Sequence, residues 1–138
     1  MRRLQLSHRH LPGQVTMIAV AGAVDLHSCG RLRGYLDEVR RCPGEQLVFD
    51  MTDVPYIDGS GVQVLVEAHR YARDHGTIIR MAGLRPQALR TLEVTQPAWD
   101  ISVHLTLEAA LRVVLADRRI ASCVGHHSAG QTGLDTPD

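Results

Sequence analysis

The sequence predicts an α/β fold in which a mixed, mostly parallel sheet of about four to five strands is covered by about four helices. Two observations predict it. Short runs rich in β-branched residues alternate along the chain with segments whose apolar residues recur at helical spacing. Only the first two strand-like segments follow each other without a helix between them. The first strand is therefore expected to be the antiparallel exception, at an edge of the sheet.

The first part of the chain predicts a hairpin and then a helix. Residues 4–8 alternate weakly between apolar and polar, and residues 15–21 form a compact apolar run. The dipeptide Pro12-Gly13 marks the turn between them. Apolar residues then recur at helical spacing on one face of a helix that ends at Pro43-Gly44. These residues are Leu32, Tyr35, Leu36 and Val39.

Two strand–helix units follow. Residues 46–51 contain three apolar residues in a row, which favours a central strand. The next helix starts near Asp58 and ends at Gly76, because glycine is favoured just past the end of a helix. Residues 77–82 predict the following strand, and residues 85–94 predict a short helix.

The last expected elements are a short strand and a helix. Residues 101–104 fit the strand, and Thr106 is a good N-cap for the helix, because its hydroxyl can accept a hydrogen bond from the first turn. Residues 118–138 are rich in Gly, Ser, Thr and His and carry almost no apolar anchors, so we expect a flexible tail. A chain of 138 residues is typical of one domain, which we place at residues 1–117.

Composition and charge argue against several classes of protein. The formal net charge is zero, which argues against a general nucleic-acid binder. Residues 1–10 lack the apolar core of a signal peptide, and the longest apolar stretch, around residues 17–24, is too short to cross a bilayer. Three widely spaced cysteines favour reduced thiols over a disulfide framework. We therefore expect a soluble, cytoplasmic protein without direct contact to nucleic acid or membrane.

The most informative segment is the turn Asp58-Gly59-Ser60-Gly61, which lies between a predicted buried strand and a predicted helix. Asp58 can cap the free N–H groups of the first helical turn. A hydroxyl in that turn lies beside the positive end of the helix dipole, where an added phosphate is tolerated. The glycines remove side-chain bulk, so that another protein could approach closely. The alternative interpretation is a well-capped turn with no further role.

This turn resembles the signature of STAS domains, which occur in bacterial anti-sigma factor antagonists and at the cytoplasmic ends of sulfate transporters. The matching residues run from Tyr56 to Val62 and open an amphipathic helix. A second match, Ala21 to Leu26, resembles the Gly-x-hydrophobic-Asp stretch that ends the family's second strand. Residues 76–94 echo the family's later strand and short helix. The resemblance covers about residues 4–116 and implies a STAS-like fold.

The resemblance implies a binding function and no enzymatic one. Antagonists of this kind capture an anti-sigma factor that is also a serine kinase, and phosphorylation of a serine in the signature turn separates the two proteins. The added phosphate would bring nearly two negative charges to the contact surface. Whether the chain forms a homodimer is left open. The expected partner-binding residues are Asp25, Leu26, Asp58, Gly59, Ser60, Gly61, Val62 and Gln63.

The chain departs from the family pattern at the phosphoacceptor. The family has a hydroxyl residue directly after the aspartate, but this position is Gly59 here, and Ser60 follows it. One step along a helix rotates a side chain by about 100°, so a kinase aligned for the first position faces a different geometry at Ser60. Ser60 is the candidate phosphoacceptor. The alternative is a non-phosphorylatable STAS scaffold or sensor module in a larger regulatory assembly. Asp25 also has a simpler alternative role, as the N-cap of the following helix.

An enzyme is another class of function that some of these residues could indicate. Ser60, with Asp58 and a histidine such as His69 or His75, contains the residue types of a hydrolase. The nucleophile-elbow pattern Gly-x-Ser-x-Gly is not met, however, and His69 falls on the apolar face of its helix. We therefore predict no catalytic residues.

No metal or cofactor is predicted either. His8 and His10 flank Arg9, and Cys123 precedes His126-His127, but these groups match no standard zinc spacing. Neither a Walker A motif nor a Gly-x-Gly-x-x-Gly fingerprint appears, so nucleotide binding has no direct support.

Overall fold

The computed structural model describes residues 3–95 and 101–116, and in these ranges five strands and four helices follow one another in the predicted order. In chain order they are β1 (Gln5–Leu11), β2 (Val15–Ala21), α1 (Cys29–Val39), β3 (Gln46–Asp53), α2 (Gly59–Asp74), β4 (Ile79–Ala82), α3 (Pro86–Thr95), β5 (Ser102–His104) and α4 (Leu107–Ala116). The predicted α/β class and its alternation of strands and helices are confirmed.

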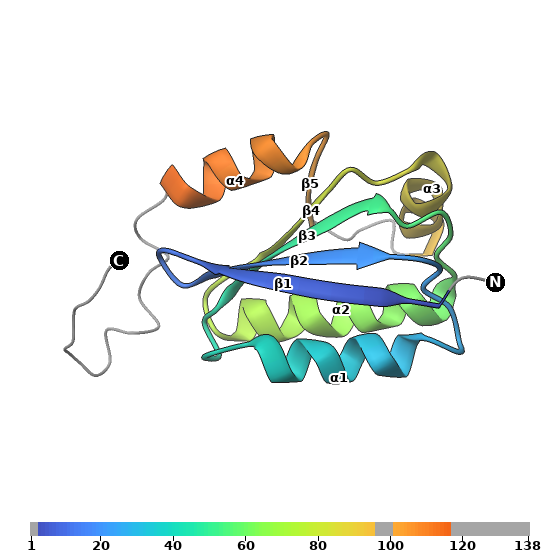
Figure 1. Ribbon diagram of the computed structural model, residues 1–138, viewed down its shortest axis with the longest axis horizontal. Coiled ribbons are helices and arrows are strands. Elements are labelled where there is room, and N and C mark those ends of the chain that lie inside the picture. The colour runs from blue at the N-terminus through green and yellow to red at the C-terminus, as the bar shows by residue number, and fades with distance from the viewer. Residues whose placement is uncertain (1–2, 96–100, 117–138) are drawn as a thin grey trace.

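The strands form one mixed sheet whose spatial order is the same as their order in the chain, from β1 to β5 (Figure 1). β1 pairs antiparallel with β2 across the tight turn that joins them, with Leu11 opposite Val15. The three remaining neighbouring pairs are parallel. The prediction of a single antiparallel strand at the edge is confirmed.

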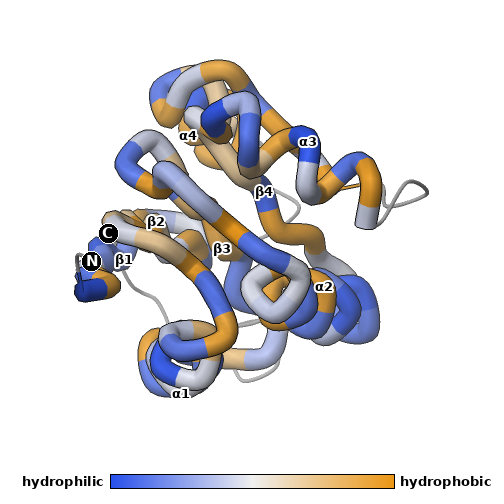
Figure 2. The backbone as a smooth tube through the Cα atoms, turned by 90° about the vertical axis from the view of Figure 1, so that its right-hand side faces the viewer, coloured by the Kyte–Doolittle hydropathy of each residue, from blue (hydrophilic) through white to orange (hydrophobic). Residues whose placement is uncertain are grey.

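Helices cover both faces of the sheet. α1 and α2 lie side by side against one face, and α4 lies against the other (Figures 1 and 2). Alternate side chains of β3 point to opposite faces of the sheet. Leu47 and Phe49 pack in the larger core under α1 and α2, whereas Val48 packs in the smaller core under α4. β3 is therefore buried on both faces, which explains its continuous apolar run.

The helix ends follow the predicted local signals. α2 ends before Gly76, whose φ of +79° is the left-handed conformation that glycine adopts most readily. α3 begins at Pro86, where the missing N–H group of proline costs no hydrogen bond. The Thr106 hydroxyl accepts a hydrogen bond from the Ala109 N–H at 3.2 Å and caps α4.

One prediction about the cysteines is wrong. Cys29 is a free, half-buried thiol as expected, but Cys42 is disulfide-bonded. An odd number of cysteines argues against a framework of bridges but leaves room for a single one. Cys123 and the predicted tail at residues 118–138 lie outside the described residues. In the described part of the chain, no helix has the length and apolar character that a membrane span requires.

Candidate functional site

The segments that follow β2 and β3 run side by side at one edge of the sheet. Val24 and Ile57 form an isolated parallel bridge. The Val24 N–H donates to the Tyr56 carbonyl at 3.0 Å, and the Asp58 N–H donates to the Val24 carbonyl at 3.1 Å. The carboxyl ends of parallel strands meet at the same edge, so the two family-like segments of the sequence, which are far apart in the chain, become neighbours in the fold.

Asp58 connects these two segments through its side chain. Its Oδ1 atom accepts a hydrogen bond from the Gly61 N–H at 3.1 Å, which makes it the N-cap of α2, as predicted. Its Oδ2 atom accepts a hydrogen bond from the Leu26 N–H at 3.3 Å. One carboxylate therefore fixes the start of α2 and the loop after β2 at the same time.

Asp25 orders the loop that leads into α1. Its carboxylate accepts hydrogen bonds from the backbone N–H groups of His27 at 3.0 Å and Ser28 at 3.1 Å. The Ser28 hydroxyl closes the turn by donating to the Ala23 carbonyl at 2.9 Å. The N-cap position of α1 itself is Ser28, without a side-chain capping bond. Asp25 therefore caps the turn before α1 and does not occupy the N-cap position of the helix.

The two glycines of the signature turn have different roles. A Cβ atom on Gly61 would lie 2.6 Å from the Val24 carbonyl oxygen and 2.7 Å from Ile57 Cγ1, so only glycine lets α2 begin this close to the neighbouring loop. A Cβ atom on Gly59 would meet nothing within 4 Å. Glycine is required by packing at position 61, whereas position 59 has room for a side chain.

Most of the predicted contact residues lie at the surface. Leu26 is 68% exposed, and Tyr56 beside the turn is 46% exposed. Gly59 and Gln63 are exposed as well, and Ser60 is half-buried at the second position of α2. An apolar side chain and a hydroxyl thus lie close to the two carboxylates of the site.

Val62 does not belong to this surface. It is only 1% exposed and packs in the core, so its side chain cannot contact a partner. The reason is helical spacing, because Val62 begins the buried face of α2 that continues through Leu65 and Val66. His69 follows on the same face and is 4% exposed, which agrees with its predicted place among packed side chains.

The sequence did not indicate the role of Gln87 of α3, whose side chain hydrogen-bonds to the backbone of Ile57 just before the signature turn. Its side-chain oxygen accepts a hydrogen bond from the Ile57 N–H at 3.0 Å, and its side-chain nitrogen donates to the Ile57 carbonyl at 3.1 Å. The side-chain amide thereby pairs with Ile57 as a neighbouring strand would. No local pattern around Gln87 distinguishes it from an ordinary polar helix residue.

A hollow of about 520 Å³ lies beside the loop after β2. Its lining includes Arg31 and His27 as well as the carboxylate residue Asp25. The Arg31 guanidinium also donates to the Leu4 carbonyl. The surface around Leu26 therefore carries both signs of charge, which suits a protein partner better than a small anion.

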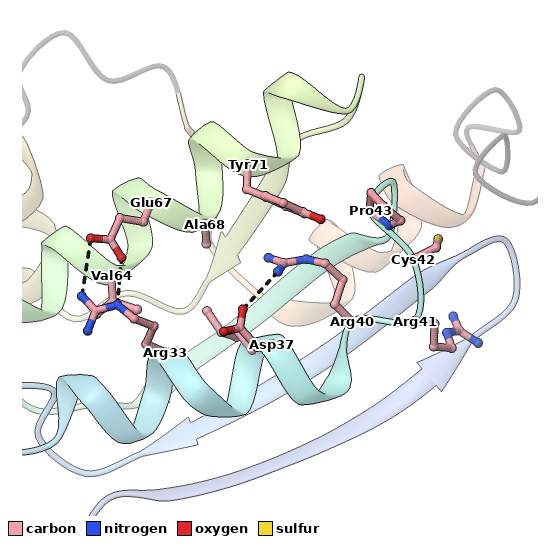
Figure 3. A pocket seen from close by; sticks show the side chains of 11 residues that line it. Arg33, Asp37, Arg40, Arg41, Cys42, Pro43, Val64, Glu67, Ala68 and Tyr71 are labelled. Carbon is pink, nitrogen blue, oxygen red and sulfur yellow. Dashed lines mark hydrogen bonds and ion pairs between the residues drawn. The ribbon is translucent and has the colours of Figure 1, made fainter.

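A second hollow, of about 500 Å³, lies between α1 and α2 and is lined by several arginines (Figure 3). Arg33 donates to Glu67 at 2.9 Å, and this ion pair lowers the pKa of the Glu67 carboxyl. The Arg40 guanidinium lies 4.4 Å from the centroid of the Tyr71 ring and 3.8 Å from Asp37. Because these cations already have partners, the hollow is a poor candidate for an anion site.

Comparison with known proteins agrees with this architecture. Residues 9–110 match the STAS domain family. Over 78 residues the chain is 30% identical to the anti-sigma-B factor antagonist of Listeria monocytogenes, and the match covers 56% of this chain and 68% of that protein.

Solved structures share the fold at low sequence identity. An anti-sigma factor antagonist from Mycobacterium paratuberculosis has a TM-score of 0.72 at 20% identity, over 82% of this chain and 95% of that one. The phosphorylated form of the Bacillus cell fate determinant SpoIIAA has a TM-score of 0.61 at 14% identity, over 80% of this chain and 99% of that one. The mixed five-stranded sheet with four helices is therefore the STAS fold, as the sequence predicted.

Proposed function

We propose a binding function for this chain, which belongs to the STAS domain family and within it to the anti-sigma factor antagonists. Its proposed partner is an anti-sigma factor of the serine-kinase type. Antagonists of this family are non-enzymatic regulators, so the function lies in binding. By holding the anti-sigma factor, the chain would release a sigma factor and so regulate transcription. This proposal places the protein in the cytoplasm, where sigma factors act.

The observation that carries the proposal is the double hydrogen bond of Asp58, which fixes Leu26 and the start of α2 relative to each other. A surface with an ordered backbone loses little conformational entropy when a partner binds. Leu26 provides an exposed apolar side chain on this surface, which a partner could bury. The proposed contact residues are Asp25, Leu26, Asp58, Gly59, Ser60 and Gln63, whereas Gly61 is buried like Val62 and serves the packing of the turn.

The proposed control is phosphorylation of Ser60. A phosphate there would add about 1.5 to 2 negative charges close to the Asp58 carboxylate. The N-terminus of α2 tolerates this charge while the surface is open to water. In a complex, the same charge would be desolvated without a paired cation, and this cost favours dissociation. Gly59 helps a kinase to reach Ser60, because no side chain precedes the hydroxyl on the turn.

Intact-mass measurement after incubation with a candidate anti-sigma kinase and ATP tests the proposal. We expect wild type to gain one phosphate and Ser60→Ala to gain none. The double variant Gly59→Ser/Ser60→Ala moves the hydroxyl to the usual family position, where the space around Gly59 accommodates it. Phosphate on this double variant, with none on wild type, would mean that the kinase recognises the turn but requires the first position.

The absence of a hydroxyl at Gly59 favours one alternative function. The chain would then be a non-phosphorylatable STAS scaffold or sensor module in a larger regulatory assembly. In that case the kinase binds and phosphorylates its usual antagonist, yet wild type gains no phosphate and forms a complex that ATP does not dissociate. Size-exclusion chromatography with and without ATP distinguishes the two functions.

A further inference from the structure

Two histidines lie close together on β1, outside the candidate site described above. His8 and His10 are two residues apart on one strand, so their side chains leave the sheet on the same face. Both are exposed, and their ring centroids are 4.9 Å apart. Around one tetrahedral zinc ion with Zn–N bonds of about 2.0–2.1 Å, two imidazole centroids would be separated by about 5 Å. The pair has the spacing of two ligands of one metal ion.

The hydrogen bonds of His10 determine which of its nitrogens carries the proton. The Thr16 hydroxyl donates its only hydrogen to the Glu45 carboxylate at 2.5 Å, and the same hydroxyl oxygen lies 2.9 Å from His10 Nδ1. His10 Nδ1 must therefore be the donor in that contact. In the neutral ring, Nε2 then carries a lone pair and no hydrogen.

A polar side chain holds His8 in a similar way. His8 Nδ1 lies 2.6 Å from the hydroxyl oxygen of Tyr35. The Tyr35 hydroxyl can accept from Nδ1–H or donate to Nδ1, depending on the tautomer of His8. When Nδ1–H donates in this contact, Nε2 of His8 also has its lone pair free. Histidine ligands of metals commonly have this arrangement, in which the second ring nitrogen is anchored by a neighbouring oxygen.

We propose that Nε2 of His8 and Nε2 of His10 bind one Zn²⁺ ion, or a similar divalent cation that prefers imidazole, at the surface of β1. In the part of the chain that the structure describes, no group of three or more His, Cys, Asp or Glu side chains could hold a metal. Water therefore completes the coordination of this two-histidine site. This proposal departs from the sequence prediction of no metal, because the spacing of the histidines did not show Thr16 and Tyr35 beside the rings.

The charges around the pair allow a cation to bind. Arg9 lies between the two histidines in sequence, but alternation along the strand places it on the other face. The guanidinium of Arg41 is neutralised by Glu45 at 2.6 Å, and the same Glu45 carboxylate accepts from the Thr16 hydroxyl behind His10. The Arg41–Glu45 ion pair therefore leaves little net positive charge beside His10.

Isothermal titration calorimetry, in which Zn²⁺ is added to the metal-free 138-residue chain, tests this site. We expect saturable binding of Zn²⁺ and no binding of Mg²⁺, which prefers oxygen ligands. His8→Gln/His10→Gln should weaken binding at least tenfold. The matched control is His126→Gln/His127→Gln, which removes another histidine pair and should leave the affinity unchanged. Equal Zn²⁺ affinity in wild type and His8→Gln/His10→Gln would overturn the proposal.

Positioning of the rings has its own test. Thr16→Val and Tyr35→Phe keep both ligands but remove an anchor from Nδ1, and each should weaken Zn²⁺ binding about tenfold. Far-UV circular dichroism shows whether each variant is folded. The two variants test different rings, because Thr16 contacts His10 and Tyr35 contacts His8. Long-range ¹H–¹⁵N spectra of the imidazole groups report the tautomer directly. A hydrogen on Nε2 of His10 in the metal-free protein would contradict the site.

Discussion

The Asp58 carboxylate accepts a hydrogen bond from the backbone N–H of Leu26, 3.3 Å away and 32 residues earlier in the chain. The same side chain caps α2 through the Gly61 N–H. The exposed Leu26 and the hydroxyl of Ser60 are thus held on one ordered surface. Asp58 therefore has a structural role that is independent of any phosphorylation.

Replacing Asp58 should lower stability. Asp58→Ala removes the N-cap of α2 and the bond to Leu26, and we expect the free energy of unfolding to fall by about 0.5–2 kcal/mol. Asp58→Asn keeps one oxygen acceptor for the Gly61 N–H and should lose less. Urea denaturation measures both values. If Asp58→Ala unfolds at the same urea concentration as wild type, the carboxylate has no such role.

The glycines of the turn provide a matched pair of substitutions. Gly61→Ala places a Cβ atom 2.6 Å from the Val24 carbonyl oxygen, so we expect a loss of about 1–3 kcal/mol from overpacking. Gly59→Ala meets no atom within 4 Å and should be neutral or stabilise the protein by up to about 1 kcal/mol, because alanine favours the helix. The midpoint of thermal unfolding should fall for Gly61→Ala and stay the same or rise for Gly59→Ala, and equal shifts would contradict this difference.

Leu26 should contribute to partner binding without contributing to stability. Leu26→Ala removes a side chain that is 68% exposed, so the unfolding midpoint should stay the same while the affinity for the anti-sigma factor falls at least tenfold. Leu105, which is 93% exposed and precedes α4, provides the control. Calorimetric titration with the same partner should give wild-type affinity for Leu105→Ala. The reverse ranking of the two variants would move the binding surface toward α4.

Gln87 should be important for stability although it lies outside the turn. Gln87→Ala leaves the Ile57 N–H and carbonyl without their partner, and the loss should be about 1–3 kcal/mol. Arg90→Ala, at an exposed position of the same helix, should change stability by less than about 0.5 kcal/mol. Chemical denaturation compares the two. Amide hydrogen exchange at Ile57 should also become faster in Gln87→Ala alone.

The stability of the protein should depend on His104 below neutral pH. Burial and the neighbouring Arg80 guanidinium lower the pKa of His104 below its ordinary value of 6.5. The unfolded chain then binds this proton more readily than the folded one, so the free energy of unfolding falls as the pH drops through about 6.5 toward the lower, folded-state pKa. Denaturation curves of wild type and His104→Gln at about pH 7.5 and pH 5.5 should show a smaller loss in the variant. An identical loss in both proteins would exclude His104 as a cause.

The sequence predicted the elements of the fold well because each carries a local signal. The apolar run around Val48, the spacing of Leu32 and Leu36, and the cap at Thr106 depend only on neighbouring residues. The site was predicted less completely. The bond from Leu26 to Asp58 and the support of Ile57 by Gln87 join residues about 30 positions apart, and no periodic pattern encodes such pairs.

For Val62 the local motif misled the prediction. The family-like turn predicted that Val62 contacts a partner, but Val62 also begins the apolar face of α2, and that face is buried in the core. Cys42 shows a further limit, since composition alone did not reveal its disulfide.

The order of the strands in the sheet is the same as their order in the chain, which affects how the protein is assembled during synthesis. Each strand pairs with the one that left the ribosome before it, and no strand has to enter between two that are already paired. The sheet can therefore grow from its N-terminal edge while translation continues. The loops after β2 and β3 meet early in this process, but Gln87 emerges 30 residues after Ile57. The nascent surface around Asp58 thus gains its last support only when α3 has been translated.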